Sequence, residues 1–107
     1  MKIADRYRLI VEQARTLAKS FGEQPDGKRI DRALALLEKG LTELCEWEEQ
    51  VGEIPQMRLE SKLSPVLLNV HATYDRARVL YEDNESEAEG AQIWELEQLI
   101  YRLLNDL

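Results

Sequence analysis

The chain has 107 residues, of which 44% are hydrophobic and 33% are charged, with only three prolines and five glycines. These proportions are typical of one compact domain, residues 1–107, whose core is large enough to fold without a disulfide, a metal or a cofactor. The net charge of −7 repels the phosphates of nucleic acids, which argues against a nucleic-acid partner.

The sequence excludes an internal disulfide and shows no membrane-spanning segment. Its single cysteine, Cys45, has no second thiol to pair with. No apolar run approaches the roughly 20 residues of a membrane-spanning helix, and charges within residues 1–6 interrupt what a signal peptide would need as an apolar stretch. The sequence therefore predicts a cytoplasmic protein without membrane contact.

Apolar residues recur at alternating steps of three and four through the first half of the chain, which is the spacing of amphipathic helices. This spacing predicts helices at about residues 2–21 and 27–50, separated by a turn that contains Gly22, Pro25 and Gly27. Because the turn is short, we expect the two helices to form an antiparallel hairpin.

A proline interrupts the apolar pattern of the next segment. Ser64 followed by Pro65 is typical of a helix N-cap and the first helical residue. The pattern therefore predicts that residues 55–63 form either a separate short helix or a kinked lead-in, and that a helix occupies residues 65–83.

The last helix is predicted at residues 87–106, where Ser86 and Glu89 have the spacing of a capping box. The chain shows no strand pattern and no internal repeat. The predicted fold class is all-α: an antiparallel helical bundle of long helices plus one short helix at residues 55–63, similar to a four-helix bundle.

Charge is distributed unevenly over these segments. Basic side chains are in excess in residues 1–22, whereas acidic side chains are in excess in residues 23–53 and 85–107. The first helix is therefore complementary to the second and the last helices, and we expect it to lie beside them. Glu48, in line with the apolar face of its helix, is expected to reach solvent or an arginine of the first helix.

The densest group of carboxylates surrounds Trp47 and consists of Glu43, Glu46, Glu48, Glu49 and Glu53. Glu48-Glu49 resembles the start of the Glu-Glu-x-x-Glu motif of the all-α nucleoside triphosphate pyrophosphohydrolases. The resemblance implies a magnesium site and nucleotide hydrolysis. The chain departs from the motif at Gly52, and its only Glu-x-x-Asp, Glu23 to Asp26, lies upstream.

Helical geometry places Glu46 and Glu49 opposite the apolar face of their helix, where carboxylates are usually solvated. No metal site is therefore predicted. The hydrolase remains an alternative, and it requires Glu46 and Glu49 to face a second acidic pair, for which Glu82 and Glu85 are the candidates.

Other side chains with chemical potential give no predicted catalytic residue. His71 and Asp75 are spaced to share a hydrogen bond on one helix, but no second histidine completes a zinc site. None of the four serines lies in a nucleophile motif, and a Cys–His pair would require Cys45 to meet His71. The sequence predicts no catalytic residue, no metal and no cofactor.

Several apolar residues lie outside the predicted core faces, and these are the candidate partner-binding residues. They are Leu36, Gly40 and Trp47 on the second helix, Leu68 and Val79 on the third, and Trp94 and Tyr101 on the last. Gly40 permits the close approach of another backbone or an aromatic ring. Large apolar side chains beyond one core indicate a partner protein or a second copy of the chain.

The sequence predicts a small acidic protein-interaction module of the adaptor, chaperone or inhibitor type, binding another protein or itself as a homodimer. In size, charge and architecture it is similar to the small acidic helical export chaperones of bacteria. Two alternatives stay open. One is the magnesium-dependent nucleotide hydrolase, and the other is an acidic mimic of nucleic acid, in which the acidic faces of the second and last helices form one surface.

Overall fold

The computed structural model describes all 107 residues as four α-helices and two 3-10 turns. The elements are α1 (Ile3–Gly22), α2 (Asp31–Cys45), η1 (Val51–Glu53), η2 (Gln56–Arg58), α3 (Leu59–Asp83) and α4 (Glu87–Asp106). There is no strand, which confirms the predicted all-α class. None of the helices combines the length and apolar composition needed to cross a bilayer.

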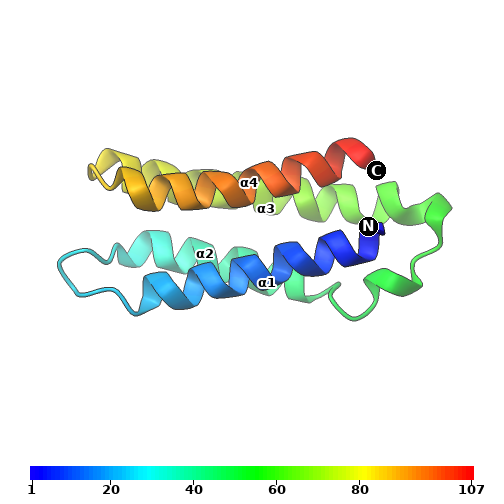
Figure 1. Cartoon of the computed structure of the whole chain (residues 1–107), viewed down its shortest axis with the longest axis horizontal. Coiled ribbons are helices and arrows are strands. Elements are labelled where there is room, and N and C mark those ends of the chain that lie inside the picture. The colour runs from blue at the N-terminus through cyan, green and yellow to red at the C-terminus, as the bar shows by residue number, and fades with distance from the viewer.

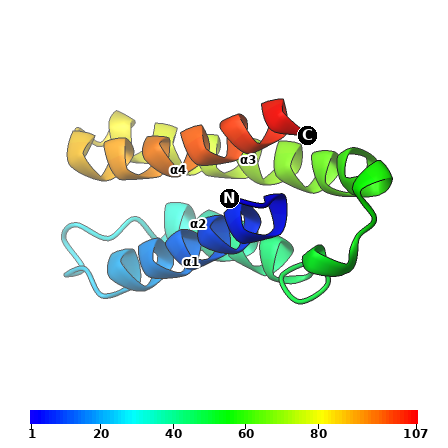
Figure 2. The ribbon, with the colours of Figure 1, turned by 45° about the vertical axis from the view of Figure 1, so that its right-hand side comes forward.

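The helices form two layers in an elongated bundle of 47 × 22 × 21 Å. Figure 1 shows α3 beside α4 in one layer and α1 beside α2 in the other, and the view in Figure 2 agrees. Each helix contacts two neighbours, so that the diagonal pairs, α1 with α3 and α2 with α4, do not meet. Both chain termini lie at the end of the bundle where the segment after α2 crosses to α3.

Helix α2 is shorter than its apolar pattern predicts, because backbone turns occupy both ends of the predicted range 27–50. The N–H groups of Lys28 and Arg29 donate to the carbonyl of Pro25, and Ile30 is extended, so the helix begins at Asp31. After Cys45 the chain continues in turns as far as η1. The apolar pattern extends beyond both ends of α2 because Ile30 and Trp47, which lie outside the helix, still pack against the core.

Helix α3 runs unbroken through Pro65, so the separate helix at residues 55–63 and the new start at Pro65 are wrong, whereas residues 59–63 do lead into this helix. A proline inside a helix removes one backbone hydrogen bond and costs about 3 kcal/mol relative to alanine. The flanking Leu63 and Leu67 are fully buried in the core. Burial of these two leucines offsets the cost of Pro65, and tertiary packing overrides the local signal.

The turn between α3 and α4 is a helix-capping motif. Glu85 has a left-handed backbone with φ of 59°, and the N–H of Ser86 donates to the carbonyl of Tyr81. These are the features of a Schellman motif, here with glutamate where glycine is usual. Ser86 occupies the N-cap position of α4 without a side-chain hydrogen bond, so the predicted capping box is not formed.

Candidate functional site

Four of the predicted partner-binding residues are large apolar side chains that the bundle leaves exposed. The exposed fraction is 61% for Leu68, 40% for Val79, 51% for Trp94 and 52% for Tyr101. All four belong to α3 or α4. We call the surface formed by these four side chains the α3–α4 face.

The four side chains lie around one point on the boundary between the two helices. Glu97 of α4 contacts Arg78 of α3, which in turn bonds Asp75. Leu68 lies seven residues before Asp75 and Val79 four residues after it, so both share its side of α3. On α4, Trp94 lies three residues before Glu97 and Tyr101 four residues after it, so both lie on the same side of the helix as Glu97. Trp94 also lines a hollow together with Glu82 of α3.

The three candidates on α2 are placed differently. Leu36 and Trp47 are partly buried and pack against the core. Gly40 is buried, and a Cβ atom added there would lie 2.7 Å from Cζ of Tyr74. The aromatic ring that Gly40 admits therefore belongs to α3 of the same chain, which leaves Gly40 unavailable to a partner.

An ionic cluster centred on Arg78 lies between the apolar residues of the α3–α4 face. The guanidinium of Arg78 is 2.6 Å from an oxygen of Asp75, 2.6 Å from an oxygen of Glu82 and 3.2 Å from an oxygen of Glu97. Nε2 of His71 is 3.8 Å from the other Glu97 oxygen. Each charged side chain of the cluster therefore has a partner within the chain.

Glu97 is the unusual member, because its side chain is only 3% exposed. Burial, and then a hydrogen bond with Asp75, raise the pKa of Glu97 to about 8 although Arg78 opposes the change. The Arg78 hydrogen bond lowers the pKa of Asp75, and the carboxylates of Asp75 and Glu82 raise the pKa of Arg78. A protonated Glu97 can therefore donate to the ionised Asp75.

The sequence did not reveal this cluster as a unit. The predicted bond between His71 and Asp75 is replaced by one from Arg78 to Asp75, and His71 faces Glu97 instead. The available signal was the spacing of Arg78 at three residues from Asp75 and four from Glu82. The burial of Glu97 depends on the packing of α4 against α3, which has no local signature.

The predicted position of the basic helix is confirmed, since α1 lies between α2 and α4. Arg15 of α1 is 3.1 Å from Glu48, as expected for a carboxylate reaching an arginine of the first helix. Arg6 of α1 is 2.6 Å from Asp106 of α4. These pairs are exposed, and each stabilises the fold by about 1 kcal/mol or less. Their main effect is to favour the placement of α1 beside α2 and α4 over other arrangements of the helices.

The arrangement that the hydrolase alternative requires is absent. Glu46 and Glu49 are exposed just beyond α2, whose Glu43 bonds Asn69 of α3. Glu82 lies 13 residues after Asn69 on α3, which is about 20 Å along the helix axis. No three His, Cys, Asp or Glu side chains form a group that could hold a metal ion.

The nucleic-acid mimic also lacks the surface it needs. Its acidic faces belong to α2 and α4, which are diagonal in the bundle and do not adjoin. Cys45 is partly buried with its sulfur 3.5 Å from the Arg15 guanidinium, and His71 lies in the separate cluster between α3 and α4.

Comparison with known proteins adds no further guide to this site. The sequence matches no protein-family model, and neither a curated protein nor a solved structure shows significant similarity to it.

Proposed function

We propose that this chain is a protein–protein interaction module that binds through the α3–α4 face, and that a second copy of the chain is the partner which this face fits. Such a module acts through contacts, as adaptors, chaperones and inhibitors do. The observation that carries the proposal is the exposure of Leu68, Val79, Trp94 and Tyr101 around one ionic cluster. Tryptophan and tyrosine are frequent anchors of protein interfaces.

The α3–α4 face is suited to two-fold self-association. Because α3 and α4 are antiparallel and Glu97 lies level with the stretch between His71 and Arg78, Trp94 is near the level of Val79. Tyr101 is near the level of Leu68 by the same register. A two-fold axis through the cluster and across the helices would then place the Val79–Trp94 end of one copy on the Leu68–Tyr101 end of the other, so that both copies use the same patch.

The energy available from this surface suits a weak dimer. Complete burial of one large apolar side chain is worth about 1.5–3 kcal/mol, and each of these residues is about half exposed. Eight such side chains in a dimer supply on the order of 10 kcal/mol before the cost of association is subtracted. We therefore expect dissociation constants in the micromolar range or weaker.

The lone thiol of Cys45 is consistent with a cytoplasmic location, which forms part of the proposal.

Light scattering across micromolar concentrations tests the proposal. The wild-type chain should exceed the mass of one chain as concentration rises, and Leu68→Asp should return it to the mass of one chain with an unchanged helical circular dichroism spectrum. Met57→Asp is the matched control, because Met57 is 97% exposed but lies in η2, away from this face. A strictly monomeric wild type at high micromolar concentration, or equal effects of the two substitutions, would contradict the proposal.

A further inference from the structure

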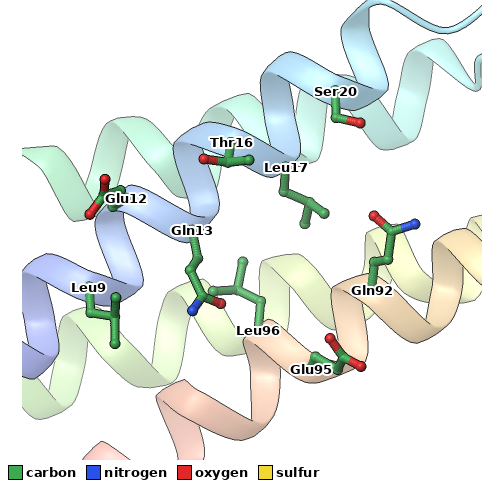
Figure 3. Close-up of a pocket in the computed structure, with 9 residues that line it drawn as sticks. All are labelled: Leu9, Glu12, Gln13, Thr16, Leu17, Ser20, Gln92, Glu95 and Leu96. Carbon is green, nitrogen blue, oxygen red and sulfur yellow. The ribbon is translucent and has the colours of Figure 1, made fainter.

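A second surface lies between α1 and α4, on the other side of α4 from the α3–α4 face. Figure 3 shows Leu17 of α1 and Leu96 of α4 between the two helices, with Leu9 at one end of the same groove. The groove has a volume of about 460 Å³. A second hollow of about 270 Å³ shares Leu9 and is lined by Arg6 and Arg102, so the end of the groove nearer the chain termini is basic.

The borders of this groove are acidic. Glu12 of α1 and Glu95 of α4 line it, and neither carboxylate takes part in any of the ion pairs within the chain. The other lining residues include no lysine, arginine or histidine. An occupant with cationic side chains would therefore gain two attractive contacts without breaking an existing ion pair.

The shape of the groove favours a helix over an extended peptide. Its lining on α1 extends from Leu9 to Ser20, which is about 16 Å or three helical turns at the rise of a helix. A peptide that binds as a β-strand needs a free strand edge, and the chain has no strand; an extended proline-rich peptide needs aromatic lining, and no aromatic residue lines this groove. A helix satisfies its own backbone hydrogen bonds and can pack its side-chain ridges between those of α1 and α4.

We propose that the α1–α4 groove binds an amphipathic helix of about three turns, whose apolar stripe packs on Leu9 and Leu17 above the buried Leu96 and whose flanking lysines or arginines meet Glu12 and Glu95. This site is separate from the α3–α4 face. Trp94 follows Gln92 by two residues, about half a helical turn, so the two side chains point to opposite sides of α4. A chain that self-associates through one face therefore keeps the other free for a helical partner.

The test uses a fluorescent probe peptide with leucines at positions i, i+3, i+4 and i+7 and lysines on both sides of the leucine stripe. Fluorescence anisotropy should show saturable binding to the wild-type chain. Two further probes, one with glutamate in place of each lysine and one with a central proline that prevents a helix, should bind at least about tenfold more weakly. Absence of saturable binding by the lysine probe would overturn the proposal, as would equal binding by the proline probe.

Charge reversal in the chain locates the site. Glu12→Lys with Glu95→Lys should weaken the lysine probe by about tenfold or more. Glu46→Lys with Glu49→Lys is the matched control, because it makes the same change in net charge at exposed carboxylates outside the groove and should change affinity less than about twofold. Equal weakening by both double variants would show general charge attraction and overturn the proposal. Light scattering of the groove variant should match the wild type, which separates this test from self-association.

Discussion

The α1–α2 pair and the α3–α4 pair differ in how many large apolar side chains they expose. Within α1 and α2 the only exposed large apolar side chain is Leu9, at 38%, and it lies in the groove beside α4. The α3–α4 pair exposes four such side chains, by 40% to 61%. The excess of apolar surface is therefore confined to one pair and is not the general consequence of a small chain with too little polar surface. This difference is the basis for proposing the α3–α4 face as an interaction surface.

The largest expected effect comes from the ionic cluster inside the α3–α4 pair. Glu97 has a pKa of about 8 in the folded chain, against 4.5 for an ordinary glutamate, so the folded state holds a proton that the unfolded state has lost. The stability that neutral Glu97 contributes is fully present below pH 4.5 and is lost as pH rises to about 8. Where the folded state holds one proton more than the unfolded state, the free energy of unfolding falls by about 1.4 kcal/mol for each pH unit, which amounts to a few kcal/mol over this range.

Urea unfolding of the wild type and Glu97→Gln between pH 5 and about pH 8 measures this linkage. Glutamine keeps a hydrogen-bond donor toward Asp75 and cannot ionise, so the variant should lose the downward slope and be the more stable protein at the upper end. The neighbouring Glu95→Gln should keep the wild-type slope, because Glu95 is exposed and unpaired. Parallel pH profiles for wild type and Glu97→Gln would show that Glu97 is ionised throughout, and the cluster would then be an ordinary ion pair.

A smaller effect is expected where the two helix pairs meet most closely, at Gly40. Alanine favours a helix over glycine by about 1 kcal/mol, but its Cβ would lie 2.7 Å from the buried ring of Tyr74. Overpacking of this kind costs about 1–3 kcal/mol, so after the gain in helix propensity Gly40→Ala should lower the free energy of unfolding by up to about 2 kcal/mol. Chemical denaturation provides the measurement.

Gly27→Ala is the control for Gly40→Ala, because a Cβ at Gly27 would meet nothing within 4 Å. It should change the free energy of unfolding by less than about 0.5 kcal/mol. If Gly40→Ala were as stable as Gly27→Ala, the two pairs would be able to move apart at this point, and the contrast between a closed α2–α3 contact and an open α1–α4 groove would be lost.

Helical periodicity was sufficient to predict the class of fold and the direction in which most side chains point. Leu68, Val79, Trp94 and Tyr101 are exposed because a step of 100° per residue places them off the core face, which can be worked out without knowing the neighbours. Pro65 could not be placed in this way, since its tolerance depends on the burial of Leu63 and Leu67 by other helices.

The candidate site was predicted only as far as its apolar part. The burial of Glu97 and the acidic groove between α1 and α4 both depend on which helices are neighbours and how closely they pack. Single-helix patterns do not contain that information. Gly40 shows the same limit, because the spacing indicated a close approach but could not distinguish a ring of the same chain from that of a partner.

The most direct test of the role of the α3–α4 face is Trp94→Ala, measured for both folding and association. Because 51% of Trp94 is exposed, we expect the free energy of unfolding of the monomer to fall by less than about 1 kcal/mol, whereas self-association followed by sedimentation velocity should weaken by about tenfold. A loss of about 3 kcal/mol or more in folding stability would show that Trp94 belongs to the core. Unchanged association of a folded Trp94→Ala chain would contradict the account.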